Sequence, residues 1–193
     1  MTTRPLRLAL IVASTRQGRF GEAVGRWAAC LARDRPEYAI DVIDLADLAL
    51  PADLSGSADV RDFAERIGAA DAFLIVTCEY NHGYPASLKL AVDSVREEWA
   101  AKPVGFVCYG GVAGGLRAVE QLRQIFAELH AVTMRDTVSF HFPHTRIAPD
   151  GRVDDPAIAE SAETAARTLF DRLAWWGTAL RDARSALPYA PVT

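Results

Sequence analysis

The sequence predicts an α/β fold: an open, doubly wound, mostly parallel sheet with helices on both faces. Short apolar runs without polar alternation are typical of strands that are buried on both faces. These runs alternate with segments whose apolar residues recur at helical spacing, as in a series of right-handed β–α–β crossovers. A length of 193 residues suits one domain, so we expect a single unit over residues 1–193.

The first part of the chain predicts two strands with a helix between them. A strand is expected at 6–13, where an apolar run ends in the polar loop 14–21. Apolar residues at helical spacing follow from Ala23, and Pro36 limits that helix. A second strand is expected at 38–43.

The middle of the chain has the clearest strand signal. An irregular connection at 45–57 and a short amphipathic helix at 60–68 lead to the uninterrupted apolar run 72–77. The loop 78–85 is polar and aromatic. Its last residue, Pro85, suits the first turn of a helix that extends toward Trp99.

The last part of the chain predicts a further strand and two helices. The strand is expected at 103–109 and opens into a glycine-rich loop at 110–115. The remaining expectations are a helix at 116–129, a less regular piece at 132–142, a loop at 143–156, a helix at 158–180 and an extended tail at 187–193.

Composition argues against several classes of function. The 21 basic and 25 acidic side chains give a net charge of −4, whereas nucleic-acid-binding proteins usually have a basic excess. No apolar run approaches the roughly 18 residues that a membrane span needs. The cysteines Cys30, Cys78 and Cys108 are odd in number and widely spaced, which disfavours a disulfide framework. We therefore expect a soluble, cytoplasmic protein without nucleic-acid or membrane partners.

The loop after the first predicted strand has the composition of an anion site. In a doubly wound sheet, ligands bind outside the carboxyl ends of the strands, at the topological switch point. This loop offers the hydroxyls of Ser14 and Thr15, the guanidinium groups of Arg16 and Arg19, and flexible backbone. Such donors suit a phosphate monoester. The alternative is an ordinary helix cap with solvated arginines.

The loop after the strand 72–77 combines backbone amides with an aromatic face. A flat heteroaromatic ligand could stack on residues 79–82, Glu-Tyr-Asn-His, while N–H groups meet its polar edge. The alternative is a capped turn whose tyrosines only pack. No partner carboxylate is identifiable for His82, so no catalytic role is assigned to it. Cys78 is expected to be a small buried side chain without reactivity.

The loop 110–115 contains four glycines, which let a ligand edge approach the main chain closely. A helix entry alone would need one glycine at most, so a binding role is favoured. The remaining histidines, His130, His141 and His144, lack the spacing of metal ligands, and no metal site is predicted.

Several motifs together resemble those of the NADPH-dependent FMN reductase family. They are Ser14-Thr15-Arg16 with Gly18-Arg19, Glu79-Tyr80-Asn81, Pro85-x-x-Leu88-Lys89-x-Ala91-x-Asp93, Lys102-Pro103-Val104, Tyr109-Gly110-Gly111-x-x-Gly114-Gly115-Leu116-Arg117 and Glu120-Gln121-Leu122-Arg123. The resemblance extends over about residues 6–135, and its three loop motifs appear in order at three predicted strand ends.

The resemblance implies a flavodoxin-like fold, a doubly wound five-stranded parallel sheet with helices on both faces. It implies that the protein binds FMN and reduces it with NADPH or NADH. It also implies electron transfer to free flavin, quinones, azo dyes or metal oxyanions, and assembly as a homodimer or homotetramer. The implied phosphate ligands are Ser14, Thr15, Arg16 and Arg19 with the backbone of Gly18, Phe20 and Gly21. The implied ring-binding residues are Glu79, Tyr80, Asn81, His82, Tyr109, Gly110 and Gly111.

The sequence departs from many relatives at two places. Cys78 stands where many have proline. Arg19 and Gly21 stand near the positions at which many relatives have a serine and an asparagine, which shifts more of the phosphate binding onto the arginines.

The expected mechanism needs little from the protein's own side chains. Hydride chemistry at the flavin N5 belongs to the cofactor, so no protein acid or base is expected to be indispensable. The nicotinamide and the acceptor are expected to bind in turn, with ping-pong kinetics.

Two other functions remain alternatives. An electron-carrying flavodoxin would have a hydroxyl-rich phosphate loop and a strongly acidic surface, which two arginines and a charge of −4 disfavour. A flavin-free interaction protein would not bind FMN. The sequence leaves open the acceptor, the choice between NADPH and NADH, and whether FMN is tightly bound. For an oligomer interface, we expect exposed apolar positions such as Trp99 and Phe126.

Overall fold

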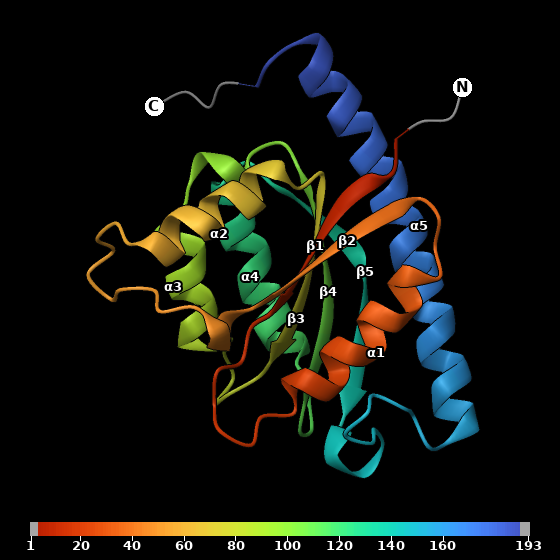
Figure 1. Cartoon of the computed structure of the whole chain (residues 1–193). Coiled ribbons are helices and arrows are strands. Elements are labelled where there is room, and N and C mark those ends of the chain that lie inside the picture. The colour runs from red at the N-terminus through yellow and green to blue at the C-terminus, as the bar shows by residue number, and fades with distance from the viewer. Residues whose placement is uncertain (1–3, 190–193) are drawn as a thin grey trace.

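The computed structural model describes residues 4–189, and its centre is a five-stranded parallel sheet in the order β2-β1-β3-β4-β5 (Figure 1). Its strands are β1 (Leu6–Val12), β2 (Tyr38–Asp44), β3 (Ala72–Cys78), β4 (Pro103–Gly110) and β5 (Val132–His141). The chain turns in opposite directions from β1 and β3, so the switch point of the sheet lies between these two strands. The predicted doubly wound, flavodoxin-like fold is confirmed.

Helices cover both faces of the sheet, as the buried strands require. Helix α1 (Gly21–Arg33) and the long α5 (Pro156–Ala186) pack on one face, and α2 (Ala58–Ala69), α3 (Ala86–Ser94) and α4 (Leu116–Glu128) pack on the other. A hydrophobic core lies on each face of the sheet, and successive residues of β1 point into the two cores alternately. Leu8 and Leu10 face α1 and α5, whereas Ala9 and Ile11 face α2 to α4. Short 3₁₀ turns occupy Leu45–Asp47, Glu97–Trp99 and Pro143–Thr145.

The prediction of a less regular piece at 132–142 was wrong, because β5 is a continuous strand over most of it. Only three of its side chains are buried, and the polar residues at 135–137 interrupt its apolar residues, so no uninterrupted apolar run forms. The register also shifts between Val104 and Phe106 of its neighbour β4. The sequence therefore lacks the strand signal that the inner strands have.

The helix after Pro85 is shorter than predicted. Helix α3 ends at Ser94, since Val95 is extended with φ −140° and ψ 151°, and Trp99 belongs to a separate 3₁₀ turn. The tail after Leu187 has no regular structure as far as residue 189, and the rest of the predicted extended tail lies outside the described residues. No helix within residues 4–189 combines the length and the apolar character needed to cross a bilayer.

Trp99 and Phe126 are core residues, so the prediction that they form an exposed interface was wrong. Both are 0% exposed, and their ring centroids lie 5.5 Å apart. The ring centroid of Trp99 also lies 4.7 Å from that of Phe73 in β3, and its indole N–H donates to the carbonyl of Val92. Large aromatic side chains fill the space between the sheet and α2 to α4 here, and that burial decides their orientation.

Candidate functional site

Three loops converge at the carboxyl edge of the sheet, as predicted. Figure 1 shows the segments that follow β1, β3 and β4 together at the lower edge of the sheet. The hydroxyls of Ser14 and Tyr80 are 2.7 Å apart and join the first loop to the second across the switch point. The second loop joins the third through the Glu79 N–H, which donates to the Tyr109 carbonyl at 3.1 Å.

The backbone between β1 and α1 has an unusual number of free donors. Within residues 4–189, the N–H groups of residues 15–18 and 20–23 have no hydrogen-bond acceptor. Phe20 occupies the N-cap position of α1 and contributes no side-chain cap. Gly18 has φ +67°, a left-handed conformation that glycine adopts without strain. An uncapped helix N-terminus preceded by free amides is a suitable site for an anion.

The side chains of this loop fall into two groups. Thr15 and Arg16 are exposed, and the Arg16 guanidinium lies 5.2 Å from the centre of the Tyr80 ring. Ser14 is 0% exposed, and its hydroxyl is bonded to Tyr80. Ser14 therefore links two loops in this structure, whereas Thr15 and Arg16 are open to a ligand.

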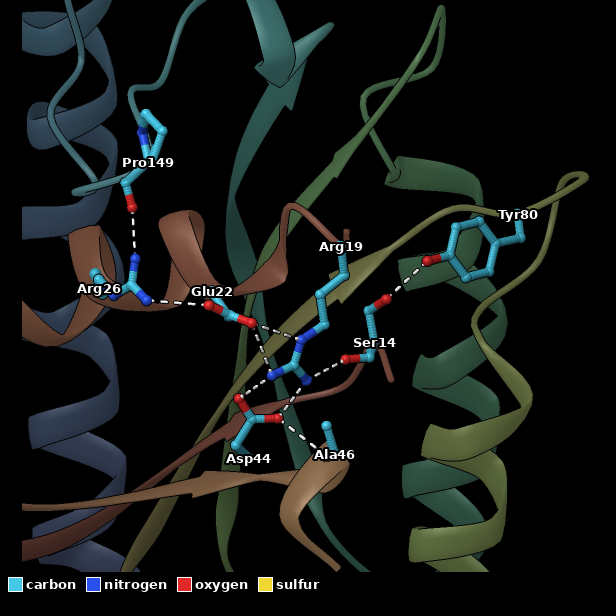
Figure 2. A network of polar contacts seen from close by, with 8 residues as sticks. All are labelled: Ser14, Arg19, Glu22, Arg26, Asp44, Ala46, Tyr80 and Pro149. Atoms are coloured by element: carbon cyan, nitrogen blue, oxygen red, sulfur yellow. Dashed lines mark hydrogen bonds and ion pairs between the residues drawn. The ribbon is translucent and has the colours of Figure 1, made fainter. Parts of the chain in front are cut away.

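Arg19 is fully engaged with protein groups (Figure 2). Its guanidinium donates to both carboxylate oxygens of Asp44, at 2.5 and 2.7 Å, and its Nε–H and one Nη–H donate to Glu22 at 3.3 and 3.2 Å. The remaining N–H donates to the Ser14 carbonyl at 2.6 Å. Because arginine has five N–H donors, none is left over in this arrangement. The side chain is 9% exposed.

The second loop is a tight turn with a strained backbone. Tyr80 and Gly83 exchange two backbone hydrogen bonds of 2.9 and 3.1 Å. The two residues between them, Asn81 and His82, have φ values of 49° and 75°. Asparagine tolerates this conformation, whereas histidine adopts it at some cost, a feature that is common at functional sites.

Helix α4 holds this turn in place. Gln121 donates to the His82 carbonyl at 3.0 Å, and Arg117 lies 3.2 Å from the His82 ring nitrogen Nδ1. Arg117 also pairs with Glu79 at 2.5 Å. Arg117 and Gln121, which belong to motifs after the third loop, therefore hold the second loop in position.

Two buried polar atoms at this edge lack a partner among the described residues: Glu79 Oε2 and the Tyr109 hydroxyl. The Glu79 side chain is 6% exposed, and Tyr109 is 5% exposed. Burial raises the pKa of the Tyr109 hydroxyl, so it remains protonated. Buried polar groups in proteins nearly always have a partner, and unpaired ones commonly belong to a ligand or water site.

Glycines of the third loop are required by close contacts. Gly115 has φ +89°, and a Cβ there would lie 2.8 Å from the Tyr109 nitrogen. A Cβ on Gly110 would lie 3.0 Å from the Gly115 nitrogen and 3.4 Å from the Glu79 Cβ. Gly111 is exposed, and a Cβ there would meet only the Phe142 ring, at 3.8 Å. The second and third loops thus approach each other through main chain.

The end of β5 supports the glycine loop, and sequence reasoning missed this. Ser139 donates to the Gly114 carbonyl at 2.9 Å, and the Phe142 N–H donates to the Gly110 carbonyl at 2.8 Å. In the sequence, this support could have been found only from the position of Phe142 directly after a strand. That strand, β5, was not predicted. No group of three or more histidine, cysteine or acidic side chains within residues 4–189 could hold a metal ion.

Comparison with known proteins decides the family. The family model described as NADPH-dependent FMN reductase matches residues 6–145. This chain belongs to that family. The protein is an FMN-dependent NAD(P)H oxidoreductase. The resemblance found in the sequence is confirmed.

Curated relatives of this FMN reductase include enzymes named for quinones. A 2-hydroxy-1,4-benzoquinone reductase of Burkholderia sp. is 29% identical over 194 residues, which span 93% of this chain and 98% of that protein. A quinone reductase of Escherichia coli K12 is 34% identical over 138 residues, which span 67% of this chain and 73% of that protein.

Solved structures share the fold. FerB, a flavoenzyme NAD(P)H:(acceptor) oxidoreductase from Paracoccus denitrificans, superimposes with a TM-score of 0.73 at 24% identity, over 90% of this chain and 97% of that one. An azoreductase, AzrA, superimposes with a TM-score of 0.57 at 14% identity, over 84% of this chain and 98% of that one.

FMN fits the residues at the carboxyl edge of the sheet. The free amides before α1 suit its phosphate, whose oxygens accept several hydrogen bonds. The unpaired Glu79 Oε2 and the exposed backbone of Gly111 suit the polar edge of its ring. A site for a phosphorylated planar cofactor therefore matches both the donor set and the unpaired atoms.

Proposed function

We propose that the three converging loops hold FMN while the protein transfers hydride equivalents from NADPH or NADH to quinone, free flavin or azo acceptors. The observation that carries this proposal is the row of free backbone amides at residues 15–18 and 20–23, next to the switch point. A site for the phosphate at one end and a turn that presents backbone at the other end suit FMN better than they suit an unphosphorylated ring.

Residues of the first loop bind the phosphate. The amides of residues 15–18 and 20–23 donate to its oxygens, and the exposed Thr15 and Arg16 add a hydroxyl and a positive charge. Ser14 contributes through its bond to Tyr80, which keeps the first loop beside the second.

Residues of the other two loops bind the ring. The turn at residues 79–82 and the backbone of Gly110 and Gly111 line its edge, and the Tyr109 carbonyl holds the turn by accepting the Glu79 N–H. Amide dipoles at this edge stabilise negative charge on the reduced cofactor. Bound FMN supplies the redox chemistry, since its ring accepts hydride from a nicotinamide and passes electrons on.

The protein contributes orientation rather than acid–base chemistry. The Arg117 guanidinium lies against the His82 ring, and burial raises the pKa of the Cys78 thiol, so this thiol is not set up as a nucleophile. NAD(P)H and the acceptor bind one after the other at the same face of the cofactor site, so no second substrate site is needed. This order of binding gives ping-pong kinetics.

The surroundings of the site suit flat, apolar acceptors. Val112 lies in the glycine loop and is 82% exposed. Leu116, which follows the loop, and Phe142, which donates its N–H to Gly110, are 42% and 43% exposed. Quinones are supported further by the names of the Burkholderia and Escherichia coli relatives.

The location and the oligomeric state are supported by other side chains. Three free thiols support a reducing, cytoplasmic location. Trp175 and Trp176 are exposed on α5, with ring centroids 5.1 Å apart, and this exposed aromatic pair supports a homodimer or homotetramer.

A binding and turnover experiment tests the proposal. The purified protein is stripped of flavin and titrated with FMN and with riboflavin, and oxidation of NADPH and NADH is then followed with 1,4-benzoquinone, free FMN and an azo dye. We expect binding with a preference for FMN, and parallel lines in double-reciprocal plots. Failure of the folded apoprotein to bind FMN would refute the assignment of the three loops. Binding without nicotinamide oxidation would indicate an electron carrier instead.

A further inference from the structure

The Arg19 guanidinium connects three separate segments of the chain. It joins the end of β2, through Asp44, to the first turn of α1, through Glu22, and to the Ser14 carbonyl at the start of the loop (Figure 2). Ser14 follows the last residue that is bonded to β3, since the Ala13 N–H donates to the Val76 carbonyl at 2.9 Å. Arg19 therefore fixes the chain just where it leaves the sheet.

We infer that Arg19 and Asp44 are positioning residues for the phosphate loop, and that Arg19 is not itself a phosphate ligand. The inference rests on the proposed function, because it concerns the loop that binds the FMN phosphate there. It also changes the role that the sequence assigned to Arg19. A phosphate oxygen could bind this guanidinium only after a bond to Asp44, Glu22 or Ser14 had been broken.

Asp44 is held firmly enough to serve as an anchor. It is the last residue of β2, and its Oδ1 also accepts the Ala46 N–H at 3.0 Å. Its side chain is 19% exposed and that of Arg19 is 9% exposed, so the pair is largely shielded from solvent. Two parallel N–H to oxygen bonds fix both the distance and the plane of the guanidinium, which a lysine could not do.

The local charge balance agrees with this role. Arg19 and Arg26 are matched by Asp44 and Glu22 in one continuous network, and Arg26 extends it to the Pro149 carbonyl. This network has no net charge to offer an anion. Arg16 is the cation of the loop without a carboxylate partner among the described residues.

Binding of FMN and riboflavin to variants of the apoprotein separates the two possible roles of Arg19. The informative variants are Asp44→Asn, Arg19→Met and the double variant, in which both charges are removed and no buried charge is left unpaired. The matched control is Asp41→Asn, which breaks a similar two-bond pair from β2 to Arg66, at 2.6 and 2.9 Å, on the α2 side of the sheet.

If the pair positions the loop, Asp44→Asn and Arg19→Met each weaken FMN binding about tenfold, on the scale of one charge-assisted hydrogen bond. The double variant is no weaker than either single variant, because both act through one interaction. Riboflavin affinity stays unchanged in all of them, since riboflavin has no phosphate. Asp41→Asn changes neither affinity.

If Arg19 instead binds the phosphate, Asp44→Asn releases it and FMN binding is unchanged or tighter, while Arg19→Met still weakens binding. That result overturns the inference, as does an equal loss of FMN and riboflavin affinity, which indicates a general structural defect. Wild-type protein that does not prefer FMN to riboflavin contradicts the proposed phosphate site itself. The two failures are therefore distinguishable.

Discussion

Two arginines of one loop, three residues apart, have different surroundings. Arg19 is 9% exposed and donates every N–H to protein oxygens, whereas Arg16 is exposed and contacts the face of the Tyr80 ring. The difference arises from partners that lie far away in sequence, above all Asp44 at the end of β2. Residue type therefore indicates what a side chain can bind, and its neighbours decide whether it is available.

Arg16→Ala should weaken FMN binding by about 1–3 kcal/mol, the usual range for a hydrogen bond to a charged group. The reason is that Arg16 is the exposed cation of the loop that we propose binds the phosphate. Calorimetric titration of the apoprotein measures the change, with riboflavin as the ligand that should be unaffected. Arg33→Ala, at the other end of α1, is the matched control. Equal FMN affinity in the wild type and Arg16→Ala contradicts a phosphate role for Arg16.

Thiol reactivity should distinguish the three cysteines. Cys30 is exposed, whereas burial raises the pKa of Cys108 to about 12 and also raises that of Cys78. Alkylation requires an accessible thiolate. Iodoacetamide at pH 8 should therefore add one group to the native protein, as read by mass spectrometry, and three in urea. Cys30→Ser should remove the native adduct, and a second fast adduct on native protein would show that a buried thiol is reachable.

At the scale of elements, the inner strands and the helices were predictable because their signals are local. The strands β1, β3 and β4 are buried almost throughout, so each is an apolar run that ends in turn residues. Strand β5 was missed because polar residues at 135–137 interrupt its apolar run, whereas β2, at the other edge of the sheet, has only Asp41 within its apolar run 38–43. The end of α3 was missed because amphipathic spacing continues past Ser94 to Trp99, although the backbone does not.

Lys102 shows how one element stabilises another. Its ammonium group donates to the carbonyls of Ile67 and Gly68, at 2.8 and 2.9 Å, near the C-terminal end of α2. Cations favour this end of a helix. Burial nevertheless lowers the pKa of Lys102 to about 8. The charged form is therefore held in the folded protein less firmly than in the unfolded chain, where the pKa is about 10.4.

Replacing Lys102 should change how the free energy of unfolding depends on pH. Between pH 8 and 10.4, the folded protein releases the Lys102 proton while the unfolded chain keeps it, so stability rises with pH in that window. Relative to Lys102→Met, the free energy of unfolding of the wild type should increase by about 1 kcal/mol from pH 8 to pH 9. Urea titrations at each pH measure it. Parallel pH profiles for the two proteins contradict the lowered pKa.

At the scale of the whole molecule, the site exists because the strand order brings three distant loops together. The segments after β1, β3 and β4 are far apart in sequence, and they meet because parallel strands end at one edge of the sheet. Helix α4 and the end of β5 then hold the second and third loops in position. A ligand that contacts all three loops should therefore stabilise the fold as a unit.

Thermal unfolding tests this coupling. FMN at about 100 times its dissociation constant should stabilise the apoprotein by about 2.7 kcal/mol, which corresponds to a rise in Tm of about 5–10 °C for a chain of this size. Riboflavin at the same concentration should raise Tm less, because it lacks the phosphate contacts. Equal shifts for both ligands would contradict a phosphate site, and a rise confined to one of two transitions would contradict a single cooperative unit.

The sequence by itself determined the architecture, the family and the three loops that we propose as the cofactor site, because apolar runs, glycines and loop motifs are local features of the chain. Only the tertiary structure decided which residues of those loops are available. Ser14 and Arg19 have the chemistry of phosphate ligands, yet the Ser14 hydroxyl is hydrogen-bonded to Tyr80 and the Arg19 guanidinium to Asp44. Trp99 and Phe126, which were expected to be exposed, lie in the core. The physical reason is that hydrogen-bond partners and burial depend on segments that meet only when the chain is folded.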